Sequence, residues 1–128
     1  MPHYTTLEKF LEGPARNAWT VNGPVRAYVR KSLRPYVGGK LHCLDIASVE
    51  VEESQRGKWR FADWYEIAEA AAKKHGLNGI YVESVMNPIM EGFCERHGFV
   101  RVGNYGAMSL PNFIKPIAPE KQGENSNE

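Results

Sequence analysis

Hydrophobic residues near the start of the chain recur at helical spacing before a clear stop. Leu7, Phe10 and Leu11 share one face of a helix. Thr5 and Glu8 form a capping box, in which the Thr5 hydroxyl accepts from the amide of Glu8. A glycine and a proline at positions 13–14 end the segment. The pattern therefore predicts a short helix that begins after Thr5.

In the next segment apolar and polar residues alternate along the chain, which is the pattern of a half-buried strand. The pair Asn22-Gly23 separates two apolar stretches and predicts a hairpin. The predicted inner face of the strand after this turn consists of Val25, Ala27, Val29 and Leu33. The predicted outer face consists of Arg26, Tyr28, Arg30 and Arg34. We therefore expect a strand that is apolar on one side and basic on the other.

Between residues 41 and 76 the pattern predicts a strand, a polar loop and a helix. The stretch 41–51 is apolar at odd and even positions alike, which is typical of a strand in the middle of a sheet. From Phe61 the apolar period becomes 3.6, and Gly76 stands where such a helix would end. The apolar stripe of this helix consists of Phe61, Trp64, Tyr65, Ala68, Ala71 and Ala72.

The following segment predicts a second helix between two strands. A strand over 79–85 precedes a helix with Asn87 as its N-cap and Pro88 as its first residue. This helix ends at Gly98, and a strand over 99–102 follows. One face of the helix consists of Met90, Phe93, Cys94 and His97. A further short strand is predicted over 107–110.

Together these elements predict a single domain over residues 1–116 and a polar, disordered tail over 117–128. Antiparallel strands lead into a strand–helix–strand–helix–strand half. The fold class is therefore α/β, or α+β, with one mixed sheet. Each helix crossover is expected to join neighbouring parallel strands. The length of 128 residues fits one domain of ~100–150 residues.

Composition narrows the class of protein. Hydrophobic residues make up 42% of the chain, which excludes disorder throughout. The net charge of +1 gives no reason to expect nucleic acid or a membrane surface as a partner. No apolar stretch approaches ~20 residues, and no signal pattern is visible. Two cysteines cannot form a disulfide framework, and the four histidines show no metal-ligand spacing. We expect a cytoplasmic protein without a metal.

The junction of the central strand and the next helix carries the most informative chemistry. A strand ends at Val51, a loop containing Arg56-Gly57-Lys58 follows, and a helix begins near Phe61. Helix N-termini attract phosphates through free N–H groups and partial positive charge. The same pattern also fits an ordinary loop with solvated basic residues, so the loop alone does not decide between the two interpretations.

This junction resembles a motif of the GNAT N-acetyltransferase superfamily, in which a strand ending in Val leads through Arg-Gly-Lys-Gly into a helix. A second resemblance runs from Asn87 to Phe99, and together the two cover roughly residues 41 to 103. The resemblance implies acetyl-CoA as cofactor, with its pyrophosphate on the loop amides and Asn87 facing its pantetheine arm. The implied cofactor-binding residues are Val49, Val51, Arg56, Gly57, Lys58, Trp59, Arg60, Phe61, Ala62 and Asn87.

Three residues depart from the family pattern. Trp59 replaces a glycine, Phe61 replaces a small residue, and Cys94 replaces a tyrosine. An aromatic residue at the Phe61 position is similar to phage-type members, for which the compartment would be the host cytoplasm. The departures at 59 and 94 leave a second hypothesis open. In it, a catalytically degenerate GNAT fold acts as a protein- or nucleic-acid-binding module.

Acetyl transfer to an amine needs a base for the amine proton and an acid for the leaving thiolate. Asp45 is the first candidate base, because apolar neighbours raise the pKa of a carboxyl group and histone-type members carry an acid at the matching offset. An Asp that only accepts hydrogen bonds fits equally well. Glu83 is the substitute and Glu50 the third candidate. Cys94 is the candidate acid, although its place on an apolar stripe favours packing.

The resemblance thus implies an N-acetyltransferase that moves an acetyl group from acetyl-CoA to a primary amine by direct transfer in a ternary complex. The acceptor stays open among a protein lysine, a protein N-terminus and a small amine. Because the chain is short, we expect a macromolecular acceptor on the exposed strand face. A third hypothesis places a nucleic-acid backbone on Arg26, Arg30 and Arg34, but the near-zero net charge favours a solvated face. The oligomeric state stays open, a dimer included.

Overall fold

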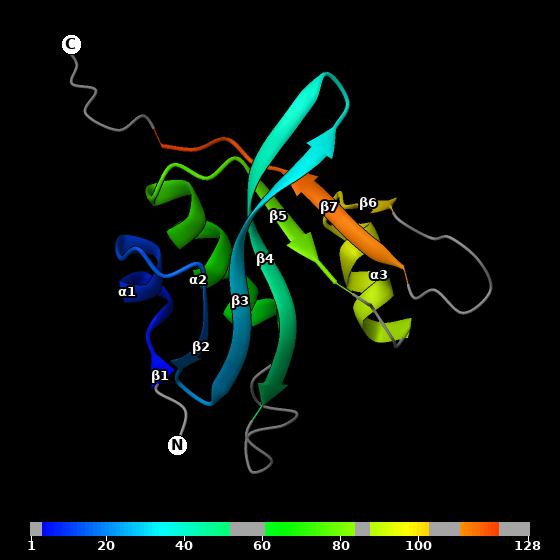
Figure 1. Ribbon diagram of the computed structural model, residues 1–128. Helices are drawn as coiled ribbons and strands as arrows, with labels where there is room; N and C mark the ends of the chain where they lie inside the picture. The colour runs from blue at the N-terminus through cyan, green and yellow to red at the C-terminus, as the bar shows by residue number, and fades with distance from the viewer. Residues whose placement is uncertain (1–3, 52–60, 84–87, 103–110, 121–128) are drawn as a thin grey trace.

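A computed structural model describes residues 4–51, 61–83, 88–102 and 111–120 (Figure 1). In chain order the elements are β1 (Tyr4–Thr5), α1 (Leu7–Glu12), β2 (Asn17–Asn22), β3 (Val25–Tyr36), β4 (Gly39–Val51), α2 (Phe61–Lys74), β5 (Gly79–Val82), α3 (Pro88–Arg96), β6 (Val100–Val102) and β7 (Asn112–Pro116). They form one seven-stranded sheet in the order β1-β2-β3-β4-β5-β7-β6. The predicted fold class, with a single mixed sheet, is confirmed.

The N-terminal half follows the sequence prediction with one shift. The N-cap of α1 is Thr6 rather than Thr5, and its side chain accepts from the amide of Lys9. Thr5 instead belongs to β1, which pairs in parallel with β2. Threonine fits both places, so the pattern alone could not choose between them. The hairpin between β2 and β3 forms as predicted, with Gly23 at a φ of 61°.

β4 lies in the middle of the sheet, as its apolar composition predicts. It pairs antiparallel with β3 on one side and parallel with β5 on the other. The ladder with β3 contains a bulge. Tyr28 lies opposite Ser48 and Val29 opposite Ile46, so Ala47 is an extra residue in β4.

Leu33 corrects the predicted inner face of β3. Val25, Ala27 and Val29 are buried, but Leu33 is 51% exposed. β2 pairs with β3 only as far as Arg30, and β5 pairs with β4 only from Cys43. The β3–β4 hairpin therefore extends beyond its neighbours and carries Leu33 past the core (Figure 1).

The C-terminal half contains a strand that the sequence did not predict. β7 lies between β5 and β6 and pairs antiparallel with both, so β5 and β6 are not the expected neighbours. Prolines at both ends of this short apolar stretch obscured the strand signal. Ile117 is also buried, and its amide donates to Asn78, so the ordered chain continues beyond the expected boundary at 116. The strand expected over 107–110 and the tail after 120 lie outside the described residues.

One apolar cluster joins α1, α2 and α3 to a single face of the sheet. Figure 1 shows the helices behind the strands, with α1 and α2 towards β2–β4 and α3 towards β7. The predicted stripe of α2 packs in this core, and Gly76 follows the helix at a φ of 82°. None of the three described helices covers the opposite face of the sheet. This opposite face, called the open face below, carries the candidate site.

Candidate functional site

The sheet opens into a fork between β4 and β5. Their last pair is Ile46 with Val82, after which the amide of Glu83 donates to the carbonyl of Ile46 at 3.0 Å. β4 continues to Val51, and beyond Ile46 β3 is its only strand partner among the described residues. One edge of β4 thus faces the fork over residues 47–51.

The bulge at Ala47 decides which backbone groups face the fork. The carbonyl of Ile46 points towards β5, and backbone orientation alternates along a strand. Because Ala47 adds one residue to the ladder, the next groups with this orientation belong to Val49 and Val51. Their side chains pack against the core, so these two predicted cofactor residues offer the fork their backbone.

Nine residues, 52–60, separate the end of β4 from the N-terminus of α2. Phe61 packs its ring against Trp64, Tyr65 and Phe93, with centroid distances of 5.6, 5.9 and 4.9 Å. Ala62 also packs against the core. The remaining predicted cofactor residues lie outside the described residues; they are Arg56, Gly57, Lys58, Trp59, Arg60 and Asn87.

Two carboxyl groups from neighbouring strands meet on the open face. Asp45 from β4 is fully buried, whereas the Glu83 side chain, at the end of β5, is 21% exposed. Arg30 donates to Glu83 at 2.7 Å, and Arg34 donates to Asp45. The structure thus brings together the first two candidate bases, Asp45 and Glu83, and two arginines that the sequence placed only on a basic face, whereas Glu50, the third candidate, pairs with Arg26. The contact depends on strand register and on the bulge, which no local pattern reveals.

The two carboxyl groups differ in how they meet solvent. Burial and, next, hydrogen bonding with Glu83 together raise the pKa of Asp45 to about 7, against the opposing effect of Arg34. Asp45 has no exposed surface through which to reach an amine. Glu83 has such a surface, and the geometry therefore favours Glu83, the substitute of the sequence analysis, as the group that meets an acceptor.

Cys94 lies in the main core and has no exposed surface. Burial raises the pKa of its thiol to about 11. A buried thiol with this pKa is a small apolar side chain at neutral pH. The packing interpretation therefore fits Cys94 better than the role of general acid.

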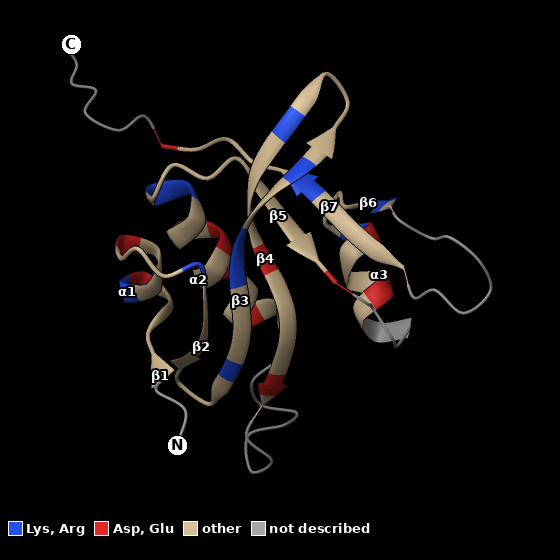
Figure 2. Cartoon of the chain, viewed as in Figure 1, with Lys and Arg blue, Asp and Glu red and all other residues tan. Residues whose placement is uncertain are grey.

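The basic outer face of β3 is neutralised by carboxylates. Arg26 pairs with Glu50 at 2.8 Å, in addition to the pairs of Arg30 with Glu83 and Arg34 with Asp45. Figure 2 shows blue and red segments side by side on β3 and β4. A face in which each arginine already has an anionic partner offers little attraction to a nucleic-acid backbone.

Aromatic rings continue the open face from β3 towards β1. Trp19 lies between Tyr28, at a centroid distance of 5.5 Å, and Tyr4, at 6.4 Å. The guanidinium of Arg30 lies 5.4 Å from the centre of the Tyr28 ring. This aromatic row of Tyr4, Trp19 and Tyr28 therefore leads to the arginine that holds Glu83.

His97 lies at the exposed end of the helix face that the sequence predicted with Phe93 and Cys94. It is exposed, although its ring stacks on Phe93 at a centroid distance of 4.0 Å. It borders a hollow of about 350 Å³ between α2 and β7. Glu69 in this hollow accepts from Lys115 at 3.1 Å and pairs with Lys73 at 3.1 Å. Glu69 in this hollow is therefore already paired with two lysines.

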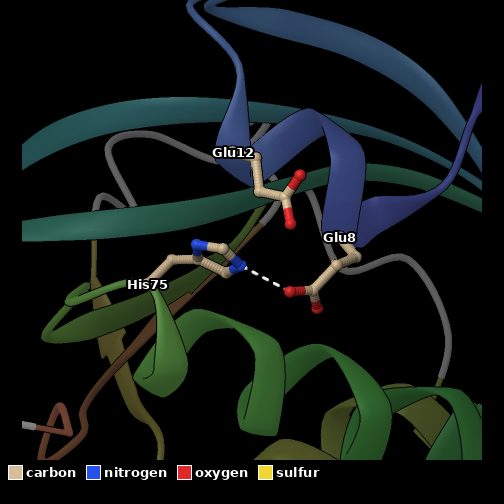
Figure 3. Close-up of side chains that lie close together, drawn as sticks. All are labelled: Glu8, Glu12 and His75. Carbon is tan, nitrogen blue, oxygen red and sulfur yellow. Dashed lines mark hydrogen bonds and ion pairs between the residues drawn. The ribbon is translucent and has the colours of Figure 1, made fainter.

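A cluster of Glu8, Glu12 and His75 joins α1 to the end of α2 (Figure 3). Their ligand atoms lie within 4.8 Å of one another, a proximity that sequence spacing did not show. Glu8 accepts from His75 Nε2 at 2.7 Å and pairs with Lys74 Nζ at 2.9 Å. Because Glu8 already contacts both the Lys74 ammonium and the His75 ring, the cluster is an ion-pair contact between α1 and the end of α2.

Comparisons with known proteins show the fold. No model of a known protein family matches the chain. No curated protein matches it in sequence. A GNAT-family acetyltransferase from Listeria monocytogenes superposes with a TM-score of 0.57 at 14% identity, over 73% of this chain and 58% of its own. A mutant AtaT toxin, bound to the C-terminus of the antitoxin AtaR and to acetyl-CoA, gives 0.51 at 14% identity, over 72% and 57%.

The NatC complex, bound to a Gag peptide and CoA, gives a TM-score of 0.51 at 20% identity, over 72% of this chain and 61% of that chain. The chain therefore has the GNAT fold that the sequence resemblance implied. It spans less than two thirds of the length of each of these three structures. No helix within the described ranges is long and apolar enough to cross a membrane.

Proposed function

We propose that this protein is an acetyl-CoA-dependent N-acetyltransferase that acetylates a primary amine by direct transfer in a ternary complex. The observation that carries the proposal is the fork between β4 and β5, which lies beside a pair of carboxyl groups and is followed in the chain by the N-terminus of α2. The shared fold with acetyltransferase structures, two of them bound to acetyl-CoA or CoA, supports it.

The residues around the fork fit this cofactor. The amide-containing arm of CoA can pair with the free strand edge at Val49, as an added strand would. The first amides of α2, from Phe61, can hold phosphate oxygens. Bound acetyl-CoA supplies an activated acetyl thioester. We assign Val49, Val51, Phe61 and Ala62 to its binding, together with Asn87 and the loop residues Arg56 to Arg60.

Glu83 is the proposed general base. An amine must lose a proton before it attacks a thioester, and a base in hydrogen-bond reach accepts that proton. Glu83 follows the last β5 residue at the mouth of the fork and is partly exposed. Arg30 and Arg34 hold its carboxylate in place. Asp45 lies behind it and acts through it.

The acceptor is proposed to be a macromolecule with a free amine that docks on the open face. No described helix covers this face, and the aromatic row of Tyr4, Trp19 and Tyr28 runs across it towards Glu83. Aromatic rings next to an arginine are typical of surfaces that bind peptides. A small pocket for a free metabolite is not required in this arrangement.

Transfer can be tested by following the release of the CoA thiol from acetyl-CoA. Three acceptors separate the classes: a peptide with a free N-terminus and no lysine, an N-blocked peptide with one lysine, and a small polyamine. We expect release with a peptide acceptor and a mass increase of one acetyl group on it. Binding of acetyl-CoA without release for any acceptor would favour the degenerate binding module instead.

A further inference from the structure

One arginine touches both carboxyl groups of the open face. Arg34 Nη2 donates to Asp45 Oδ2, and the same nitrogen lies 3.4 Å from Glu83 Oε2. The Arg34 guanidinium also lies over the Tyr81 ring, 3.9 Å from its centre. These three neighbours fix the position of Arg34, whose side chain is 30% exposed.

Protein groups surround the buried Asp45 side chain. The titratable and charged groups that face it are Arg30 and Arg34 from β3, Cys43 from β4, Tyr81 from β5, and Glu83. Burial raises the pKa values of Cys43 and Tyr81, so both stay neutral at physiological pH. Two arginines and two carboxyl groups thus remain as the groups that can carry charge.

A proton is needed to complete this arrangement. Asp45 Oδ1 has no hydrogen-bond partner among the described residues, and the side chain has no contact with solvent. Two anionic carboxylates held this close repel each other, and burial of one of them adds a desolvation cost. A proton on Asp45 removes both costs and gives Glu83 a hydrogen-bond donor.

We propose that Arg34 is a positioning residue that couples Asp45 to Glu83, so that the two carboxyl groups share one proton and titrate as a unit on the open face. The raised pKa of Asp45 agrees with this geometry. Pairs that interact this closely lose their protons in two steps that belong to the pair.

The catalytic consequence of this coupling rests on the proposed function. While Asp45 holds the proton, it donates to Glu83 and weakens Glu83 as a base. When that proton has left the pair through Glu83, which is partly exposed, Glu83 lies beside an anion and accepts a proton more readily. An N–H bond of the acceptor ammonium then breaks and an O–H bond forms on Glu83, which leaves a neutral amine. Glu83 afterwards returns the proton to water.

The chain permits a direct measurement, because it has only two aspartates, Asp45 and Asp63. Protein labelled with 13Cγ-aspartate gives two carboxyl signals, and Asp63→Asn assigns them. We expect the Asp45 signal to titrate near pH 7. In Arg34→Gln the midpoint should rise by about one pH unit or more, because a cation that favours the anion is lost. In Glu83→Gln it should fall, because a neighbouring anion is lost.

Control variants distinguish a specific shift of the Asp45 midpoint from a general loss of structure. Arg26→Gln removes a comparable arginine from the same strand face and should leave the Asp45 midpoint unchanged. If Arg34→Gln does not fold, Arg34→Lys keeps the charge but removes the guanidinium that lies over the Tyr81 ring, and a shift of the midpoint is again expected. An Asp45 signal that titrates near its ordinary value, or one that neither Arg34 nor Glu83 variants move, overturns the proposal.

The titration needs no catalytic turnover, so it tests the coupling of Asp45 with Glu83 separately from the proposed acetyltransferase function. Coupled titration without acetyl transfer would leave the carboxyl pair standing and remove the proposed function. Where transfer occurs, its rate should rise with pH through the same midpoint, and Arg34→Gln should move both to higher pH together. Transfer with a pH profile that Arg34→Gln does not move would remove the catalytic role of the coupling.

Discussion

Arg30 and Glu83, which are 53 residues apart in the sequence, form an ion pair of 2.7 Å across the face of the central strand. The pair bridges β3 and the end of β5, and Asp45 on β4 lies buried between them. The ion pair between Arg30 and Glu83 therefore covers Asp45 on the open face. It also orients the Glu83 carboxylate at the mouth of the fork.

Replacing Glu83 by glutamine should slow acetyl transfer by ~10²-fold or more, the usual effect of removing a general base. The affinity for acetyl-CoA should change little, because Glu83 is not assigned to the cofactor. Steady-state kinetics of CoA release, with cofactor affinity from calorimetry, measures both. Glu8→Gln removes another ion-paired carboxylate far from the fork and serves as the matched control. Transfer at the wild-type rate in Glu83→Gln would exclude Glu83 as the base.

Asp45 should make folding stability depend on pH in a direction opposite to that of most carboxylates. Its pKa of about 7 in the folded protein lies above the ordinary value of 3.8, so the folded state binds the proton more tightly. The stabilisation from this group is therefore complete below pH ~4 and is lost as the pH rises to ~7. The full loss is at most about 4 kcal/mol.

Asp45→Asn should remove this dependence. Urea unfolding of both proteins at pH 4 and pH 8 gives the two differences in unfolding free energy. The variant should gain stability relative to the wild type as the pH rises. An equal difference at both pH values would show that Asp45 is ionised in the folded protein throughout.

Gly79 should not tolerate a side chain. It lies opposite Cys43 at the first pair between β4 and β5, and an added Cβ would meet Cys43 Sγ at 2.6 Å and Leu41 Cβ at 3.0 Å. Gly79→Ala should therefore cost about 1–3 kcal/mol of unfolding free energy. Adding Cys43→Ala should recover part of this loss. Gly13→Ala meets its nearest atom at 3.4 Å and should be nearly neutral; an equal loss at both glycines would contradict the close approach.

Cys94→Ala should reduce stability without reducing catalysis. The thiol is fully buried in the core, so its removal leaves a small cavity and costs about 1 kcal/mol. Transfer by the folded variant should match the wild type, because no exposed surface connects the thiol to a leaving group. A ~10²-fold loss of rate in a folded variant would return Cys94 to the role of general acid.

The sequence predicted the elements in which apolar residues recur at regular spacing. It did not predict elements that are defined only by pairing with distant strands. The stripe of α2, the central position of β4 and the Asn22-Gly23 turn each follow from local spacing. β7 is five residues long, follows Pro111 and ends at Pro116, so only its pairing with β5 and β6 identifies it as a strand.

In the candidate site, too, the sequence identified individual residues but not the contacts between them. Asp45 and Glu83 were recognisable as carboxylates on neighbouring strands. The contacts of Arg30 and Arg34 with them depend on the register of β3 against β4, which includes the extra residue Ala47. The position of Leu33 beyond the core depends on where β2 and β5 stop pairing, and that is likewise a property of the whole sheet.

Hydrogen exchange with and without saturating acetyl-CoA tests the central claim most directly. The amide of Val49 faces the fork, and the first amides of a helix have no partner within it, so both should exchange readily in the free protein. We expect acetyl-CoA to slow exchange in segments 47–51 and 61–65 and to leave β7 unchanged. Binding that protects neither segment, or no binding at millimolar cofactor, would contradict the assignment of the fork as an acetyl-CoA site.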